Sequence, residues 1–599
     1  MWSNFDAEAI EKDLKILSAH GVECMRVFPL WRDFQPIKPN IGCSSKLSEY
    51  VMENGSLPQN PYFLDEEMVS RFETFLNLCD KYGIRLVVGL ITGWMSGGLF
   101  IPTALYNKNV LTDPVALYFE QLFIKGFVNR FKNRKTIYAW DLGNECNCMA
   151  ETKDRFEAVS WAATISNAIH AADPERAVVS GMHSLTLDGN WRIGDQAEFT
   201  DILTTHPYPL WCKHTTMDEM LSVRTTMHAT AQTKWYSDIG NKPCIAEEIG
   251  TMGPMVCSDE NAANFMRLNL FSLWANGAGG VMWWCNHDQN ELKTFPYSVN
   301  MIEQELGLVD KNETPKPVLK EIKKFSEFLK ENNIDLPKAK EDGVCLLAKG
   351  IDHWGVSYMT YILAKEIGLN LKFSYTYEQE LPDSNLYIMP SIAGMGHMHK
   401  DTYENLKQKV FEGADLYISS GNAYLEGFEE FVGLKVTDSC ICGQNCTVTM
   451  ADENFTFYRP MIRGYVPTTA KVLAKTDSGN PFISVNRYGK GRVFFVDAPI
   501  ENNLIKAHNG FNGKTVKIYE SIFAQHIDKL DVKVEDREIA LTYHPDEDGG
   551  FLVAVNHSKN RKMLDIKLKK GLETDRVIYG NQEFIEPFDA CVIKLKKHK

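Results

Sequence analysis

The sequence predicts an α/β protein in three parts, of which the first is a (β/α)8 TIM barrel. The chain has 599 residues, more than one hydrophobic core usually organises, so several domains are expected. Across residues 1–335, short apolar runs alternate with amphipathic stretches, which is typical of β/α units around a parallel sheet. The alternation restarts after Pro337 and changes to short alternating strands from about Val532. We therefore predict domains at 1–335, 336–528 and 529–599.

Seven apolar runs are the strand candidates of the first domain, whereas a closed barrel has eight strands. The helix candidates between them include residues 65–83, where apolar residues recur at three and four positions and Gly83 ends the pattern. The chain opens directly with an amphipathic helix for which Asp6 is a suitable N-cap. We therefore expect that the missing first strand preceded residue 1, through a shortened or mis-set N-terminus. The seven runs are 21–30, 83–91, 136–145, 177–183, 201–208, 243–250 and 280–286.

The two later domains differ in their patterning. The second domain has apolar runs separated by helical stretches, which predicts a doubly wound parallel sheet. The third has short runs with alternating polarity, which predicts a small antiparallel, β-sandwich-like domain. The runs are 343–349, 385–391, 414–421 and 491–499 in the second domain, and 538–545, 550–558, 562–570 and 590–597 in the third.

Composition excludes several classes of function. The formal net charge is −14 and no block of Lys and Arg stands beside aromatic residues, so we expect no nucleic-acid partner. No apolar run approaches the ~20 residues of a membrane helix, and the N-terminus lacks the features of a signal peptide. We therefore expect no membrane association and a cytoplasmic location. The 14 cysteines are scattered, and the spacing of Cys440, Cys442 and Cys446 lacks the paired motif of structural zinc, so we predict no metal and no cofactor.

The candidate site lies at the carboxyl ends of the predicted strands, because these ends form the reactive face of an α/β barrel. The residues found there include two carboxylates, several aromatic side chains and hydrogen-bond donors, without a Ser-His-Asp set or a glycine-rich phosphate loop. They are Arg26, Trp94, Asn144, Glu145, His183, His206, Tyr208, Glu248, Trp283 and Trp284.

Two facing carboxylates beside aromatic rings suit cleavage of a glycosidic bond. The oxocarbenium-like transition state needs one anion near the anomeric carbon and one acid at the leaving oxygen. Tryptophan faces can stack on the C–H surface of a sugar. The sequence therefore favours an enzyme that acts on an oligosaccharide substrate.

The motifs around these two carboxylates resemble those of clan A glycoside hydrolases. WDLGNECN at 140–147 is similar to the acid/base strand of that clan, and KPCIAEEIG at 242–250 is similar to its nucleophile strand. In family 5, HPY on the sixth strand, an Arg on the second and a Trp on the eighth recur, and here HPY occupies 206–208. The stretch MRVFPLWRDFQP at 25–36 and the three-part layout resemble family 5 β-mannosidases, with a layout shared by family 42 β-galactosidases.

This resemblance implies a mechanism and residue roles. Glu248 would be the nucleophile and Glu145 the acid/base residue, with their carboxyls about 5 to 5.5 Å apart and retention of configuration. Burial and the anionic Glu248 would keep Glu145 protonated near neutral pH, while Arg26 and Tyr208 would keep Glu248 ionised. Asn144 would bind the sugar 2-hydroxyl. The resemblance also implies substrate-binding roles for Trp94, His206, Trp283 and Trp284.

Two pairs of neighbouring residues leave a choice. Successive residues of a strand point to opposite faces, so only one of Glu247 and Glu248 should enter the mouth, and the motif selects Glu248. By the same rule one of Trp283 and Trp284 should pack in the core, and the sequence does not say which.

The predicted activity is that of an exo-acting β-mannosidase on short β-1,4-mannosides. β-Galactosidase and endo-β-1,4-mannanase are alternatives within the enzyme class, and a non-catalytic carbohydrate-binding protein is the alternative outside it. The resemblance further implies a flavodoxin- or amidotransferase-like middle domain that helps to build a homotrimer. The strand end with Ser419 and Ser420 has no cysteine nucleophile, so we expect a structural role for that domain.

Overall fold

The computed structural model describes residues 2–42, 47–378, 380–450 and 453–598. The chain divides into two compact units, which we call the barrel unit and the second unit. The predicted domain boundaries near 335 and 528 remain a prediction. The barrel unit is Met1–Tyr208, Gly240–Trp274 and Ala278–Ile334, and the second unit is Pro209–Ile239, Ala275–Gly277 and Asp335–Lys599.

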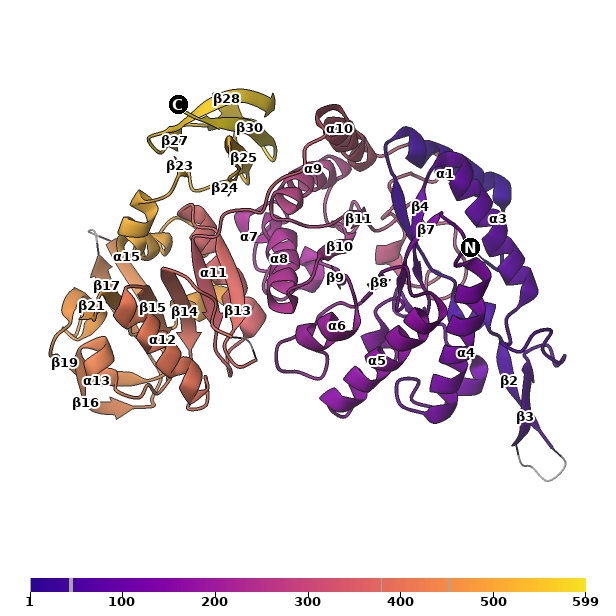
Figure 1. The fold of residues 1–599 in the computed structure, drawn as a ribbon, viewed down its shortest axis with the longest axis horizontal. Coiled ribbons are helices and arrows are strands. Elements are labelled where there is room, and N and C mark those ends of the chain that lie inside the picture. Colours follow the sequence, from indigo (N-terminus) through magenta and orange to yellow (C-terminus); the bar gives the residue numbers. More distant parts are fainter. Residues whose placement is uncertain (1, 43–46, 379, 451–452, 599) are drawn as a thin grey trace. The chain divides into compact units, whose positions relative to one another are not determined.

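The barrel unit contains seven parallel strands, each within one of the seven predicted runs (Figure 1). They form a four-stranded sheet in the order β1-β4-β7-β8 and a three-stranded sheet in the order β9-β10-β11. A parallel bridge between Val179 and Ile202 joins the two sheets. The strands are β1 (Cys24–Val27), β4 (Arg85–Gly89), β7 (Ile137–Asp141), β8 (Val178–Val179), β9 (Leu203–Thr205), β10 (Cys244–Ile249) and β11 (Val281–Trp283).

Helices lie outside these strands, as Figure 1 shows for α1, α3, α4 and α5. Helix α3 illustrates how the sequence sets an element: Asp65 caps its first turn, Gly83 ends it with a φ of 69°, and Val69, Phe72 and Leu76 are buried on one face. The helices are α1 (Ala7–Ala19), α2 (Trp31–Phe34), α3 (Glu66–Tyr82), α4 (Pro114–Phe131), α5 (Arg155–Ala172), α6 (Ile193–Phe199), α9 (Asp259–Ala275) and α10 (Pro317–Asn332).

A small apolar cluster lies between the strands of the barrel unit. It is built from Val87, Ala139, Val179 and Ile245, one residue from each of four strands. Because side chains on a strand alternate in direction, residues two positions further along two of these strands, Asp141 and Glu247, face the same interior. Polar groups therefore begin directly after the apolar layer.

The second unit is centred on a seven-stranded sheet with the order β13-β12-β14-β15-β22-β21-β20. Its first five strands are parallel and follow the flavodoxin-like order 2-1-3-4-5, as the doubly wound prediction implies. The last two are antiparallel. The strands are β12 (Gly343–Leu347), β13 (Leu371–Tyr375), β14 (Leu386–Ile392), β15 (Asp415–Ser420), β20 (Lys471–Lys475), β21 (Pro481–Tyr488) and β22 (Gly491–Val496).

Helices and an inserted pair of hairpins complete this part of the second unit. The hairpins β16–β19 and β17–β18 lie in sequence between β15 and β22, where the alternating pattern did not predict them. The helices are α7 (Val223–Thr226), α8 (His228–Gly240), α11 (His353–Glu366), α12 (Lys400–Glu412), α13 (Phe428–Val432), α14 (Ile500–Ile505) and α15 (Val516–Asp528); the hairpin strands are β16 (Leu434–Cys440), β17 (Gln444–Met450), β18 (Glu453–Arg459) and β19 (Ile462–Pro467).

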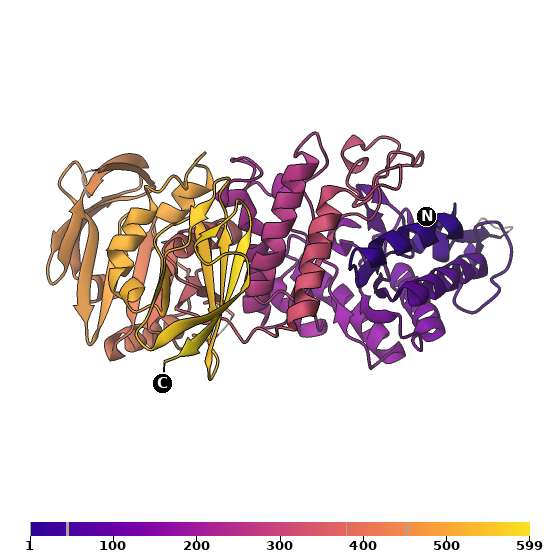
Figure 2. The ribbon, with the colours of Figure 1, turned by 90° about the horizontal axis from the view of Figure 1, so that it is seen from above.

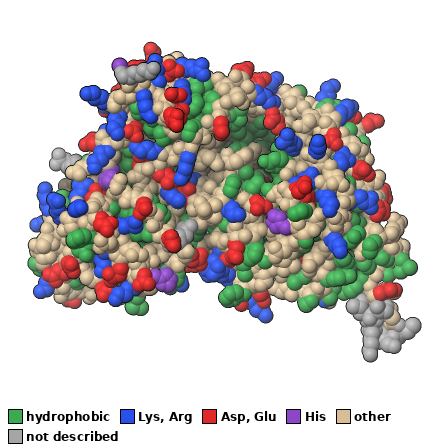
Figure 3. Space-filling model, in the orientation of Figure 1, with side chains coloured by type: hydrophobic (Ala, Val, Ile, Leu, Met, Phe, Trp, Pro, Cys, Tyr) green, Lys and Arg blue, Asp and Glu red, His purple; other side chains and the backbone are tan. Residues whose placement is uncertain are grey.

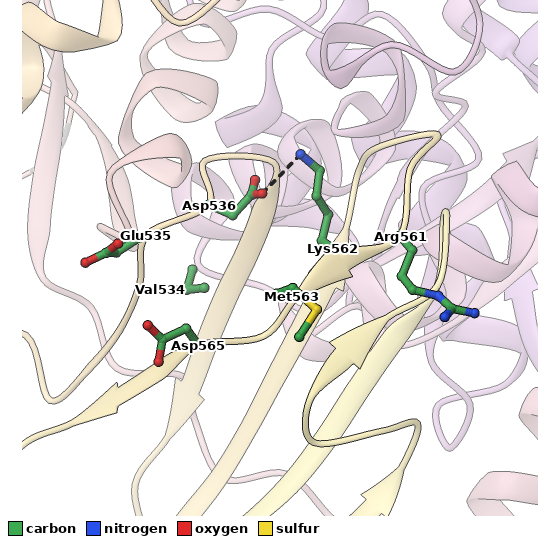
Figure 4. Close-up of a pocket in the computed structure, with 7 residues that line it drawn as sticks. All are labelled: Val534, Glu535, Asp536, Arg561, Lys562, Met563 and Asp565. Carbon is green, nitrogen blue, oxygen red and sulfur yellow. Dashed lines mark ion pairs between the residues drawn. The ribbon is translucent and has the colours of Figure 1, made fainter.

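The C-terminal strands form an antiparallel sheet, drawn in yellow in Figures 1 and 2, as their alternating polarity predicts. The sheet has the order β24-β25-β30-β28, with β24 (Ile539–His544), β25 (Gly549–Asn556), β28 (Leu572–Tyr579) and β30 (Ala590–Lys597). A hollow at its margin is lined by charged side chains (Figure 4). Lys562 there is paired with Asp536 at 3.0 Å and with Glu538.

On the face drawn in Figure 3, basic and acidic side chains are interspersed. None of the described helices combines the length and apolar character that crossing a lipid bilayer requires.

The Asp65 cap of α3 gives a test of this local account. Replacing Asp65 with Ala removes the acceptor for the backbone N–H groups of Glu67 and Met68, which lie 3.0 and 3.1 Å away. We expect Asp65→Ala to lower the free energy of unfolding by about 1 kcal/mol in urea titrations. Asp65→Asn, which keeps an acceptor, should change it by only a few tenths; an equal loss in both variants would contradict the capping role.

Candidate active site

The ends of four barrel strands bring most of the predicted residues together. Glu145 follows β7, His206 and Tyr208 follow β9, Glu248 lies near the end of β10, and Arg26 lies on β1. One carboxylate oxygen of Glu145, one of Glu248 and a ring nitrogen of His206 all lie within 4.8 Å of one another. One carboxylate oxygen of each glutamate therefore lies within 4.8 Å of the other.

Arg26 is the centre of the charge network. Its guanidinium lies 2.7 Å from Asp141 and 2.8 Å from Glu248, and it donates to Asn144 Oδ1 and the Gly143 carbonyl at 3.0 Å. Its side chain is 4% exposed, so these contacts replace nearly all of its hydration. Burial lowers the pKa of Arg26, but the charges of Asp141, Glu247 and Glu248 outweigh it and raise that pKa, so the residue stays cationic.

Strand β10 has an irregularity that simple alternation does not predict. Ala246 pairs with Val281 and Ile249 with Trp283, so β10 uses three steps where β11 uses two. Such a bulge re-aims side chains. As a result both Glu247 and Glu248 contact Arg26, at 3.2 and 2.8 Å. Simple alternation did not predict the shared contact with Arg26, and of the two carboxylates Glu248 is the one grouped with Glu145 and His206.

His206 joins the three glutamates. Its Nδ1 lies 2.7 Å from Glu145 and 3.5 Å from Glu248, and its Nε2 lies 3.4 Å from Glu247. Burial lowers the pKa of His206, but these carboxylates raise it to about 10. The imidazole is therefore a cation with carboxylates on both sides.

This imidazolium reverses the expected protonation of the two catalytic candidates. Burial raises the pKa of Glu145, yet the hydrogen bond from His206 and the charges around it lower that pKa to about 2. Burial also raises the pKa of Glu248, and the charge of Glu145 adds to the rise. These directions are the opposite of the expected ones, in which Glu145 holds its proton and Glu248 is ionised, and they favour a proton on His206 in the free protein.

Two glycines allow the backbone around Glu145 to take this shape. Gly143 has a φ of 154°, and a Cβ there would lie 2.1 Å from the Ile91 carbonyl oxygen. Gly181 has a φ of 59°, and its Cβ would lie 2.0 Å from Asp141 Oδ1. Glu145 itself has a φ of 45°, a left-handed conformation that costs free energy in a residue other than glycine.

Tyr208 and Asn144 complete the contacts of the two glutamates. Tyr208 donates its hydroxyl to Glu248 Oε2 at 2.9 Å. Asn144 accepts from Arg26 and donates to the Trp94 carbonyl at 3.1 Å, which places the main chain of Trp94 beside the site. His183 Nδ1 is 3.9 Å from Glu145 Oε1, and its Nε2 is 3.1 Å from Cys148 Sγ.

The two neighbouring tryptophans have different partners. Trp284 donates to Glu303 at 3.1 Å, and its ring lies 6.0 Å from Phe28, which in turn covers the Arg26 guanidinium at 4.7 Å. Trp283 donates to the Leu306 carbonyl at 2.9 Å. These contacts connect Trp284 to the charge network.

The sequence prediction missed Asp141, Phe28 and Glu303. Asp141 could have been found, because it ends the same apolar run that leads to Glu145. Phe28 follows Arg26 by two positions and therefore faces the same side of the chain. Glu303 ends a short 3-10 helix, Met301–Glu303, whose sequence has no periodic pattern, so no sequence signal points to it.

Two sets of three side chains have the donor types of a metal site. They are Glu145, Cys148 and His183, and Glu145, His206 and Glu248, each with donor atoms within 4.8 Å. In the second set His206 and Arg26 already neutralise the carboxylates, and a cationic imidazole is not a ligand. The geometry favours an ion-pair network over a metal centre there.

In the second unit, the strand end that carries Ser419 and Ser420 takes part in a hydrogen-bond network. Ser419 donates to Glu501, which also accepts from Tyr417 at 2.7 Å and from Tyr519 at 2.8 Å. A serine nucleophile needs a base as partner, whereas this hydroxyl is bonded to a carboxylate that three other donors share.

Comparisons with known proteins agree with this geometry. Residues 44–290 match the family model of cellulase, glycosyl hydrolase family 5. The predicted resemblance to clan A glycoside hydrolases is confirmed. Among curated relatives, mannan endo-1,4-β-mannosidase A of Hypocrea jecorina is 25% identical over 34% of this chain and 47% of its own, and that of Aspergillus aculeatus is 26% identical over 30% and 51%. The chain thus spans about half the length of these relatives.

Solved structures extend the likeness beyond the family 5 region. An exo-β-1,4-mannosidase from Opitutaceae bacterium strain TAV5 has a TM-score of 0.73 at 21% identity, covering 88% of this chain and 93% of that one. A β-galactosidase from Halorubrum lacusprofundi has a TM-score of 0.73 at 13% identity, covering 99% and 98%. At these identities the likeness shows the fold, which is the TIM-barrel fold of clan A.

Gly181 tests whether the Arg26 network depends on close backbone packing. Gly181→Ala places a methyl group against Asp141 and should disturb its ion pair with Arg26. We expect a loss of about 1 kcal/mol of unfolding free energy from the left-handed backbone and about 3 kcal/mol more from the disturbed pair. Gly83→Ala is the matched control, with a φ of 69° and no atom within 4 Å of the added Cβ. Equal losses in urea titrations of the two variants would exclude this coupling.

Proposed function

We propose that the chain is a retaining glycoside hydrolase that cleaves β-linked hexosides, with short β-1,4-mannosides as substrates. The supporting observation is the 4.8 Å limit on the distance between the facing oxygens of Glu145 and Glu248. Retaining enzymes hold their carboxyls about 5 to 5.5 Å apart, whereas inverting enzymes leave room for a water at about 6.5 to 9.5 Å. The short distance favours direct attack by one carboxylate.

Glu248 is the nucleophile in this proposal. Arg26 and Tyr208 each hold one of its oxygens, at 2.8 and 2.9 Å, which orients the carboxylate toward the anomeric carbon. The bond between the anomeric carbon and the leaving oxygen breaks as a glycosyl ester forms on Glu248. A water then attacks the ester from the opposite face, and the two inversions give retention.

Glu145 is the acid/base residue, and His206 supplies its proton. In the free protein that proton lies between His206 Nδ1 and Glu145 Oε1, which are 2.7 Å apart. As negative charge develops on the leaving oxygen, the His206 Nδ1 proton moves to Glu145 and Glu145 protonates the leaving oxygen, which leaves His206 neutral and Glu145 ionised. In the second step Glu248 is an uncharged ester, so the pKa of Glu145 falls and the residue acts as a base toward water.

The sugar contacts proposed here use the remaining predicted residues. One Asn144 amide hydrogen is held by the Trp94 carbonyl, and the other faces Met95 Sδ at 3.9 Å, a weak contact that a sugar 2-hydroxyl would replace. Trp284 would stack on the ring of the cleaved sugar, since its contacts connect it to Arg26 through Phe28. His183 would contact the sugar beside Glu145.

The proposed preference for mannosides is supported by the names of similar proteins. The curated relatives named above are mannan endo-1,4-β-mannosidases, and one structure of similar fold over most of the chain is an exo-β-1,4-mannosidase. Exo action would require the loops at 32–63 and 186–200 to close a pocket around one terminal sugar. The β-galactosidase of similar fold keeps β-galactosides as the second candidate class.

Azide rescue tests the two roles separately. Glu248→Ala should lower kcat/KM on an aryl β-mannoside by about 10⁴-fold or more, because the covalent step is lost. Azide should restore turnover and yield an α-glycosyl azide. Glu145→Ala should retain more activity on substrates with good leaving groups, and azide should yield a β-glycosyl azide. Products are identified by NMR of the anomeric proton.

Glu247 is the matched control for this assignment, because it shares Arg26 and His206 with Glu248. Glu247→Ala should lose activity through the disturbed network, and azide should not restore it. An α-glycosyl azide from Glu247→Ala but not from Glu248→Ala would move the nucleophile to position 247.

A substrate panel tests the sugar and the mode of action. We expect kcat/KM to be highest on p-nitrophenyl β-mannoside, compared with the β-galactoside and β-glucoside, and mannose alone to be released from β-1,4-manno-oligosaccharides. Release of mannobiose or longer products from the interior would indicate an endo-mannanase. No release from any of the three nitrophenyl glycosides, together with calorimetric binding of manno-oligosaccharides, would identify a non-catalytic binding protein. Sedimentation of the same preparation tests the proposed homotrimer.

A further inference from the structure

A second constellation of reactive side chains lies in the second unit, outside the proposed glycosidase site. Cys212 Sγ lies 3.6 Å from His214 Nδ1, and His214 Nε2 lies 2.8 Å from Asp352 Oδ2. The order thiol, imidazole, carboxylate is that of an activated nucleophile, its base and the group that orients the base. The sequence did not reveal it, because Asp352 lies 138 positions after His214.

The local fold holds each member of this triad in place. Thr215 fixes the turn after Cys212, since its N–H and its hydroxyl donate to the Cys212 carbonyl at 2.9 and 2.8 Å. Asp352 caps helix α11 with Oδ1, which accepts from the Gly355 N–H at 3.0 Å, so that Oδ2 remains for His214. A Cβ at Gly355 would lie 2.8 Å from the His214 ring, so glycine is needed for this approach.

The charges around Cys212 favour the thiolate. Burial raises the pKa of the thiol, but His228 and His214 outweigh it and lower that pKa to about 4. Burial lowers the pKa of His214, but Asp352 and Cys212 raise it to about 9. The other charged neighbour of Asp352 is Lys213, at 3.3 Å from Oδ2. Thiol and imidazole therefore form a thiolate–imidazolium pair over the neutral range.

Further polar atoms beside the thiolate lack partners. His228 on α8 is 1% exposed and interacts with the Cys212 thiol, while its two ring nitrogens make no well-aligned hydrogen bond to a described residue. The Tyr358 hydroxyl and the Trp354 Nε1 on α11 are also buried and make no hydrogen bond to a described residue. Their rings surround the His228 imidazole at 5.6 and 5.7 Å, and Tyr358 interacts electrostatically with Cys212. Buried polar groups without partners are unusual and point to a small polar molecule.

We propose that Cys212, activated by His214 and Asp352, is a modification site that hydroperoxides oxidise to a sulfenic acid. The sulfur lone pair attacks the terminal oxygen of the hydroperoxide, the one that carries the hydrogen, so that an S–O bond forms and the O–O bond breaks. Sulfur is oxidised by two electrons and the peroxide is reduced. The departing alkoxide or hydroxide takes the proton from His214 Nδ1 and leaves as an alcohol or water, while the Nε2 proton stays with Asp352.

The chain offers internal controls for this proposal. Cys440 and Cys442 are exposed, whereas Cys212 is partly buried, so accessibility alone would favour the first two. The hydrogen bond with Cys442 raises the pKa of Cys440, and burial and the charges of Cys442 and Asp438 raise it further. If Cys212 reacts faster than Cys440 and Cys442, or at a rate that does not depend on pH, the cause is therefore its imidazole partner and not its exposure.

The test is the pH dependence of alkylation, read by peptide mass spectrometry on the full chain with iodoacetamide. The rate at an ordinary thiol rises about tenfold per pH unit below its pKa, because only the thiolate reacts. We expect this slope at Cys440 and a nearly constant rate at Cys212 between pH 5.5 and 7.5. His214→Gln should restore part of the slope at Cys212, because His228 still lowers the pKa of the thiol, and Asp352→Asn should restore a smaller part, while circular dichroism verifies that both variants fold.

Hydrogen peroxide with dimedone tests the oxidation itself. We expect the dimedone adduct at Cys212 in the parent chain at pH 6, with a loss of about tenfold or more in His214→Gln and no adduct at that position in Cys212→Ser. A tenfold-per-unit slope at Cys212 in the parent chain, or adducts at Cys440 and Cys442 but not at Cys212, would overturn the proposal. A lack of any reaction at Cys212 across the pH range would overturn it as well.

Discussion

The arrangement of the barrel site depends on one buried guanidinium. Arg26 on β1 pairs with Asp141 at the end of β7 and with Glu247 and Glu248 on β10, so three strands meet at one cation. Taking these charges out of water is costly, and only their mutual attraction and hydrogen bonds offset the cost. Because removal of one partner would leave an uncompensated charge, the positions of the carboxylates are tightly constrained. The position of Glu248 follows from this constraint, and His206 holds Glu145 opposite it.

The same balance, between the cost of burying charges and their mutual attraction, determines how many protons the network binds. Asp141, Glu145, Glu247 and Glu248 face two cations, Arg26 and His206, which leaves an excess of negative charge if all four are ionised. Burial, with Arg26 opposing and Glu247 adding to it, raises the pKa of Asp141 to about 7. The site therefore titrates as a unit, and a pH profile of activity reports the network rather than one glutamate.

How far the sequence predicts this protein depends on how local each feature is. Hydrophobic alternation and the strand-end rule predicted seven strands and placed Arg26, Glu145, His206, Tyr208 and Glu248 at one rim, because both rules use only neighbouring residues. The bulge between Ala246 and Ile249 could not be predicted, since it depends on the register of β10 against β11. The low pKa of Glu145 could not be predicted either, because it depends on the contact with His206, 61 positions away.

The two histidine-centred clusters show why the same side chain has different effects in different surroundings. At His206 both ring nitrogens face carboxylates, which are weak bases, so the proton stays on the imidazole until a leaving group needs it. At His214 one nitrogen faces a carboxylate and the other a thiol, which is acidic enough to give its proton to the ring. A carboxylate on one side therefore fixes the orientation in each case, and the group on the other side decides whether the histidine stores a proton or creates a nucleophile.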